Sequence, residues 1–487
     1  MIQYINNKKE PMRKVDTAWL RMESPHNLMM ITGMLFLDKM PVYEDFVELL
    51  EKKFLKYRRF RQLATQNSSG SYWQNDKHFD MSSHVRRTAL PGKADYFELQ
   101  KYVSHLASTP LDKNKPLWSF DLVENYDKGP VIVSRIHHCY ADGIALIQVL
   151  LSITSVERDG QVDTSADDEI RQGHRKLGLL KKAINPAKKQ FNQSLKFLNQ
   201  VSELGKEVIA NPGLIEKGFG EASEITQELF NALTLSDDPS SVYKDELCTR
   251  KRVAWSQSLP LQEVKAIAKA TGTTVNDVLI SNLAGALREY MLDVGDSPAD
   301  KVIRATVPVN LRPLEHAKEL GNHFGLVFLN LPIFEANPLR RLEYVHEEMK
   351  QLKSSKQAIV SLGLLSLVGL APTFIQNMLL ELFSKKATTV LTNVPGPQVP
   401  LYVAGSEIRK LMFWVPQNGT IGMGISILSY NDNVEFGLII DKNLVPEPHL
   451  VIHKFPSQFN QLKDLIMMHP WDGEVHPEIA DGLYHFS

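Results

Sequence analysis

The stretch His137-His138-Cys139-Tyr140-Ala141-Asp142-Gly143 joins an apolar segment at residues 130–138 to another at 143–152. We expect the first segment to be a strand and the second a helix. Neighbouring side chains of a strand point to opposite faces, so His137 and His138 cannot both enter one pocket or easily bind one metal ion. One histidine then faces a reaction, and the other packs or makes a supporting hydrogen bond.

The same stretch offers groups for acid–base chemistry. A histidine near its ordinary pKa suits a general base that takes a proton from a hydroxyl. Asp142 can cap the following helix or pair with a cation, and Gly143 lets a ligand come close. From these residues alone, two structural histidines and a capping aspartate are the more common outcome. Cys139 has no evident catalytic partner, so we expect it to pack.

The segments on either side predict two units that mix helices and strands. In the first we expect strands at 27–38, 118–125 and 130–138, and helices at 43–57, 96–107 and 143–152. In the second we expect strands at 252–259, 302–309, 324–333, 387–392, 412–415, 421–429 and 434–440, and helices at 261–270, 275–291, 339–352 and 456–467. The sequence Tyr-Asn-Asp-Asn between the last two strands is typical of a hairpin turn.

A change of composition separates the two units. Residues 157–169 are acidic and polar, as in a solvated linker, and residues 171–198 are basic with apolar residues interleaved. The basic stretch fits an amphipathic helix on an anionic membrane or an ordinary solvated helix equally well. We therefore divide the chain into an N-terminal domain at 1–155, a helical linker at 156–248 and a C-terminal domain at 249–487.

Composition limits the classes of function. The chain has 487 residues and a formal net charge of -1, so two domains are expected and nucleic acid is not an expected partner. Two cysteines exclude a disulfide framework and fit a reducing cytosol, and the N-terminus lacks the apolar core of a secretory signal. Residues 357–380 carry no charge, but glycine, proline and amide residues interrupt them, which favours broken apolar helices over a membrane span.

Further motifs point to a family. They are Pro116-Leu117-Trp118, Asn276-Asp277, Pro308-Val309-Asn310-Leu311-Arg312, Leu320-Gly321-Asn322 and Asn393-Val394-Pro395-Gly396-Pro397. In this order, and with HHxxxDG, the chain resembles the bacterial wax ester synthase/diacylglycerol acyltransferase family of the CoA-dependent acyltransferase superfamily nearly end to end. The resemblance implies an α+β fold of two chloramphenicol-acetyltransferase-like domains, each an α/β two-layer sandwich, with an active-site tunnel between them.

The resemblance also implies residue roles. His138 would be the general base and His137 its supporting neighbour. Asp142 would hold the loop through a salt bridge, and Gly143 would leave room for the CoA arm. The other roles it implies are structural for Trp118, Asp277 and Glu23 (the acidic residue after a first helix) and substrate-binding for Arg312, Asn322, Asn393, Gly396 and Val360. The family often reads Pro-Met-His-Val-Gly where this chain has Asn27 to Gly33, so no histidine role is expected there.

The residues around Asn276 make chemical sense by themselves. Thr274 and Asp277 fit a capping box that opens a helix at Val275. Asn276 then lies in the first turn, where free N–H groups favour negative charge, and its amide could help hold an oxyanion. A plain capped helix explains the pattern as well.

The implied reaction transfers a fatty acyl group from acyl-CoA, a substrate, to a long-chain alcohol or diacylglycerol, with no cofactor and no metal. A cytoplasmic protein in peripheral contact with the inner membrane face or lipid inclusions would suit such substrates. Two alternatives stay open: a condensation-type acyltransferase with another acceptor, and a non-catalytic protein that binds lipid droplets or membranes.

Overall fold

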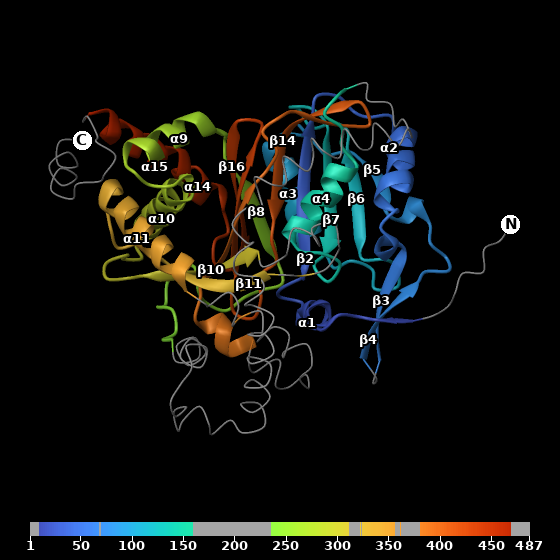
Figure 1. Cartoon of the computed structure of the whole chain (residues 1–487), viewed down its shortest axis with the longest axis horizontal. Coiled ribbons are helices and arrows are strands. Elements are labelled where there is room, and N and C mark those ends of the chain that lie inside the picture. Colours follow the sequence, from blue (N-terminus) through green and yellow to red (C-terminus); the bar gives the residue numbers. More distant parts are fainter. Residues whose placement is uncertain are drawn as a thin grey trace, which may run out of the picture.

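A computed structural model describes residues 9–67, 70–158, 235–310, 322, 324–355, 361 and 380–468. The N-terminal half (blue to teal) and the C-terminal half (green to red) lie side by side, each with a mixed sheet (Figure 1). The fold is a pair of α+β units, as expected.

The N-terminal unit has a sheet with the order β13-β14-β2-β7-β6-β5. Its strands are β2 (Met30–Leu37), β5 (Val85–Thr88), β6 (Trp118–Val123), β7 (Val131–His137), β13 (Leu401–Val403) and β14 (Ser406–Trp414). A smaller sheet holds β1 (Glu10–Pro11), β3 (Gln62–Asn67) and β4 (Gly70–Asn75). The helices are α1 (Lys14–Met22), α2 (Tyr43–Leu49), α3 (Tyr96–Ala107) and α4 (Gly143–Ser152), with short helical turns at Leu50–Phe54, Arg58–Arg61 and Met81–Ser83.

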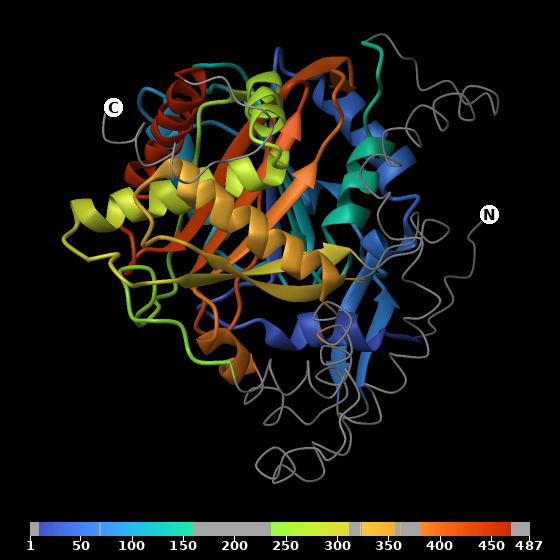
Figure 2. The ribbon, with the colours of Figure 1, turned by 60° about the vertical axis from the view of Figure 1, so that its left-hand side comes forward.

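The C-terminal unit has a sheet with the order β11-β10-β12-β15-β16-β8, and β9 pairs with β16. Its strands are β8 (Lys251–Trp255), β9 (Leu259–Pro260), β10 (Ile303–Asn310), β11 (Phe324–Leu331), β12 (Thr389–Pro395), β15 (Met423–Tyr430) and β16 (Asn433–Asp441). Its helices are α9 (Leu261–Ala270), α10 (Val275–Asp293), α11 (Pro338–Ser354), α14 (His449–Ile452) and α15 (Lys454–Met467). Figure 2 shows α10 and α11 over one face of this sheet, where their apolar residues form its core.

Most expected elements are present. The bounds of α3, α4 and α9 match the expected ranges, and Asn431 and Asp432 have the positive φ values (46° and 59°) that a tight hairpin turn requires. The helix expected at 43–57 is shorter, because α2 changes to a π-helix at Leu50–Phe54. The strand expected at 252–259 is split into β8 and β9.

One strand crosses between the units. β14 lies more than a hundred residues after residue 249, where the C-terminal domain is expected to begin. It nevertheless pairs antiparallel with β2 in the N-terminal sheet. Residues 401–414 therefore complete the sheet that carries the histidine motif, a feature that the expected division at residue 249 does not include.

Some expected features lie outside the described residues. These are the linker from residue 159, the basic stretch at 171–198, nearly all of 357–380, Arg312 and Val360. Within the described part of the chain, no helix combines the length and the apolar character needed to cross a bilayer.

Candidate active site

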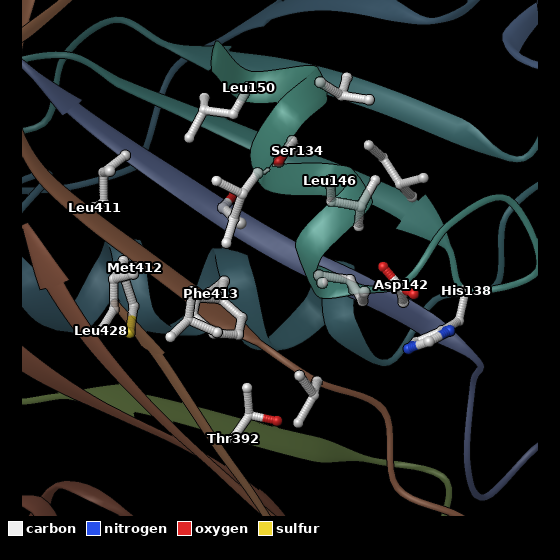
Figure 3. Close-up of a pocket in the computed structure, with 18 of the residues that line it drawn as sticks. Ser134, His138, Asp142, Leu146, Leu150, Thr392, Leu411, Met412, Phe413 and Leu428 are labelled. Carbon is white, nitrogen blue, oxygen red and sulfur yellow. Dashed lines mark hydrogen bonds between the residues drawn. The ribbon is translucent and has the colours of Figure 1, made fainter. Parts of the chain in front are cut away.

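A cavity of about 330 Å³ lies between the two units. Strands β2 and β7 and helix α4 supply one wall, and residues of β10 and β12 supply another. Figure 3 shows His138 and Asp142 at one end, with Leu150, Leu411 and Leu428 toward the other. Apart from this histidine and aspartate, the described lining residues are apolar or uncharged. A cavity lined mostly by apolar side chains suits a ligand with hydrocarbon parts.

His138 follows the last residue of β7 and contributes its ring to the cavity wall. Its N–H donates to the carbonyl oxygen of Met29 (2.7 Å), which extends the pairing of β7 with the chain before β2. The imidazole stacks on the indole of Trp19, with ring centroids 4.1 Å apart, and is tilted against Phe324. These contacts fix the orientation of the ring.

Burial determines the protonation of His138. Removal from water lowers the pKa of its imidazole to about 4, against the opposing effect of the nearby Asp142 carboxylate. The ring is therefore neutral at pH 7, the form in which a histidine accepts a proton.

His137 is held away from the cavity wall. Its Nδ1 accepts a hydrogen bond from the N–H of Cys139 (3.1 Å), so the ring proton belongs on Nε2, which lies 3.1 Å from Oε2 of Glu23. Burial alone would raise the pKa of Glu23, but His137 and Lys113 together lower it to about 2. The two histidines thus take different sides, as the alternation of a strand predicts, and Glu23 supports the one that does not line the cavity.

Asp142 and Gly143 open helix α4 beside His138. The Oδ1 of Asp142 accepts a hydrogen bond from the N–H of Ala145 (2.9 Å), which makes this residue the N-cap. A Cβ built on Gly143 would meet no atom within 4 Å, so the glycine borders open space. The capping role agrees with one of the two expected for Asp142, and its salt bridge stays a prediction.

Asn322 lies beneath the site. Its side chain is buried, and its Nδ2 donates to Oδ1 of Asp16 and to the carbonyl oxygen of His138 (both 3.0 Å). This one amide ties α1 to the turn after β7. Asn322 is not among the residues that line the cavity, so its geometry supports positioning of His138 more than contact with a substrate.

The capping box expected at α10 is confirmed. The hydroxyl of Thr274 accepts a hydrogen bond from the N–H of Asp277, and Oδ2 of Asp277 accepts one from the N–H of Thr274. The same Oδ2 lies 2.8 Å from Nδ1 of His346. Asn276 is exposed, and its Oδ1 accepts a hydrogen bond from Nδ2 of Asn393 (2.8 Å). Asn393 lines the cavity and Asn276 does not, so the pair reaches the cavity through Asn393.

Gly396 and Trp118 serve packing. A Cβ on Gly396 would lie 2.4 Å from the carbonyl oxygen of Ser429, so only glycine permits this approach of β12 to β15, at the cavity edge. Trp118 is buried in β6, where its Nε1 donates to the carbonyl oxygen of Phe60 (2.8 Å). Burial raises the pKa of the Cys139 thiol well above its usual range, which agrees with a packing role.

Sequence reasoning missed Trp19, Phe324 and Asp16. Asp16 and Trp19 are three residues apart in α1, a spacing that places both on one helical face and precedes Glu23. That spacing was the available signal. The contact of Phe324 with His138 joins positions far apart in sequence, and no local pattern indicates it.

Known proteins resemble this chain over most of its length. Residues 12–279 match the model of the wax ester synthase/diacylglycerol acyltransferase catalytic domain, and residues 320–463 match the WS/DGAT C-terminal domain. A probable diacylglycerol O-acyltransferase of Mycobacterium tuberculosis is 27% identical over 416 residues, which cover 84% of this chain and 85% of that protein. The O-acyltransferase WSD of Acinetobacter baylyi is 27% identical over 455 residues, 90% of this chain and 93% of that one.

The fold has a solved counterpart. The wax ester synthase/diacylglycerol acyltransferase from Marinobacter aquaeolei VT8 superposes with a TM-score of 0.64 at 22% identity, covering 94% of this chain and 100% of that chain. Fold and sequence matches together define an O-acyltransferase. The chain belongs to the wax ester synthase/diacylglycerol acyltransferase family.

Proposed function

We propose that the protein transfers a fatty acyl group from acyl-CoA to the hydroxyl of a long-chain alcohol or a diacylglycerol, with His138 as general base. One observation carries this proposal: a neutral, buried imidazole forms part of the wall of an apolar cavity between two sheets. A water-poor cavity suits hydrocarbon substrates and protects a thioester from hydrolysis.

The proposed steps use one proton and one carbonyl. His138 takes the proton of the bound alcohol while its oxygen attacks the thioester carbonyl, which forms a tetrahedral oxyanion. The intermediate collapses to the ester and breaks the carbon–sulfur bond. The leaving CoA thiolate takes the proton back from the imidazolium, so the enzyme returns to its starting state. A positioned base contributes about 10²–10⁴ in rate.

Other residues have supporting roles in this scheme. Stacking on Trp19 and the bond from Asn322 to the His138 carbonyl hold the base, and Glu23 holds His137. Asn393 and its partner Asn276 are our candidates for donors to the oxyanion. The open space at Gly143 is proposed for the CoA arm. The scheme requires no cofactor or metal ion beyond the two substrates.

The proposed acceptors also bear on location. Long-chain alcohols and diacylglycerols reside in membranes and lipid inclusions, so we propose a cytoplasmic enzyme that contacts such a surface peripherally. Vesicle flotation with and without anionic lipid would test this contact. Recovery of all the protein in the lipid-free fraction would contradict it.

An acceptor panel tests the function. The protein is incubated with radiolabelled palmitoyl-CoA and, in separate reactions, hexadecanol, dipalmitoylglycerol and hexadecylamine, and the products are separated by thin-layer chromatography. We expect wax ester, triacylglycerol or both, and little amide. Amide as the main product would instead identify a condensation-type enzyme, and no product from any acceptor would reject the proposal.

A further inference from the structure

The sheet face beneath α4 has an unusual pattern of side-chain sizes. Because side chains alternate along strands, the residues of one face form rows across β14, β2, β7 and β6. The outer rows hold large residues. The rows are Ile31, Ile136 and Trp118; then Phe413, Gly33, Ser134 and Phe120; then Leu411, Leu35, Ile132 and Leu122. Two small residues thus lie side by side between two phenylalanines, and all four line the cavity.

Nothing in the backbone requires glycine at position 33. Its φ lies outside the left-handed region, and an added Cβ would meet the Oγ of Ser134 at 2.8 Å, so that hydroxyl would have to rotate away, whereas the carbonyl oxygen of Met412 is at an ordinary contact distance (3.8 Å). Gly396 differs, because there a backbone atom blocks the Cβ. A glycine inside a strand weakens the sheet, and it often marks a place where a ligand comes close.

The gap lies on the path from His138 into the apolar part of the cavity. β2 starts opposite His137 and runs away from it. Gly33 is four residues past Met29, whose carbonyl oxygen accepts a hydrogen bond from the N–H of His138. At about 3.3 Å per residue, this places the gap roughly 13 Å along the strand from the histidine. Figure 3 shows Ser134 between His138 on one side and Leu150 and Leu411 on the other.

The surroundings of the gap suit hydrocarbon. Leu146 and Leu150 of α4 also line this part of the cavity, and the hydroxyl of Ser134 donates to the carbonyl oxygen of Gly33 (3.4 Å). Its polar atom therefore has a partner within the sheet, and the surface that remains is apolar and uncharged.

We propose that Gly33 and Ser134 form the subsite for the unbranched hydrocarbon chain of a substrate, and that their small size permits long chains. This inference rests on the proposed acyl transfer, whose acyl donor and alcohol acceptor both carry such a chain. A larger side chain at either position would fill the gap, so chains that extend past it would lose contacts while short chains would not.

Ser134→Leu tests the subsite, with Ser134→Ala as the matched control that removes the hydroxyl without filling the gap. kcat/KM is measured by thiol release in two series: butyryl-, octanoyl- and palmitoyl-CoA with hexadecanol, and butanol, octanol and hexadecanol with palmitoyl-CoA. We expect Ser134→Leu to lower the preference for the longest over the shortest chain about tenfold in one series. The series that changes identifies the chain as that of the donor or of the acceptor. Ser134→Ala, which leaves the gap open, should keep the wild-type ratio of kcat/KM between the longest and the shortest chain, whatever its effect on the overall rate.

Gly33→Ala serves as a second variant, since it adds one carbon and should shift the preference in the same direction by a smaller factor. Thermal unfolding confirms that each variant is folded. Unchanged profiles in both series, or an equal loss at every chain length, would overturn the subsite. If the wild-type protein itself releases no thiol with any pair, the proposed function fails instead, so the two failures are distinguishable.

Discussion

His138 combines a low pKa with a fixed position. Its pKa of about 4 makes it a weaker base than a histidine in water, but it is present in the accepting form at neutral pH. Its burial has a cost for the fold. Because the folded pKa is below the ordinary value of 6.5, the unfolded chain takes up this proton first as the pH falls. This group therefore lowers the stability as the pH falls from 6.5 to about 4, and has no such effect above 6.5.

The same pKa predicts the pH dependence of the reaction. kcat/KM follows the protonation of the free enzyme, so the acid limb should have its midpoint near pH 4, with no inflection from this histidine near 6.5. Initial rates of thiol release between pH 4 and 8, with folding checked at each pH, provide the measurement. An inflection near 6.5 that His138→Ala abolishes would show that the imidazole is solvated.

At the scale of elements, helix α10 begins at a capping box formed by Thr274 and Asp277, and Asn276 in its first turn is linked to the cavity through Asn393. The sequence predicted this box because its signal lies within four residues. It also predicted the bounds of α3 and α4 and the separation of the two histidines, since these follow from local periodicity. The stacking of Trp19 on His138 and the position of Asn322 were beyond it, because both depend on how α1 and distant segments pack on β7.

Loss of the cap should weaken α10. Thr274→Ala removes the hydroxyl that accepts the N–H of Asp277, and a lost N-cap costs about 1 kcal/mol in the free energy of unfolding. Urea denaturation measures this change. Thr273→Ala is the control, since the Thr273 hydroxyl contacts Thr271 and does not cap α10. Equal losses for the two variants would argue against a specific role of the box.

At the scale of the whole molecule, β14 connects the two units. It pairs with β2 over most of its length. Nε1 of Trp414 donates to the carbonyl oxygen of Ala254 in β8, and Nζ of Lys410 donates to that of Ser256 just after β8. The cavity therefore lies between two sheets, one of which contains a strand from late in the sequence. The sequence indicated the two α+β units, but the pairing of residues 406–414 with 30–37 depends on register across the whole chain, and no local pattern encodes it.

This exchange predicts that the N-terminal half does not fold alone. A fragment ending at residue 250 lacks β13 and β14, so β2 becomes an exposed edge, and the two faces of the sheet lose Leu411 and Trp414 respectively. We expect an aggregating fragment without a cooperative thermal transition by circular dichroism, whereas the full chain shows one. A soluble fragment with a sharp transition would contradict the structural role given to β14.

The central claim is that the imidazole of His138 takes the proton of the acceptor hydroxyl. The most direct test compares thiol release from palmitoyl-CoA with hexadecanol for the wild type, His138→Ala and the exposed-histidine control His26→Ala, all shown to be folded by thermal unfolding. We predict a loss of about 10²–10⁴ in kcat for His138→Ala and none for His26→Ala. An unchanged kcat in folded His138→Ala would contradict the account.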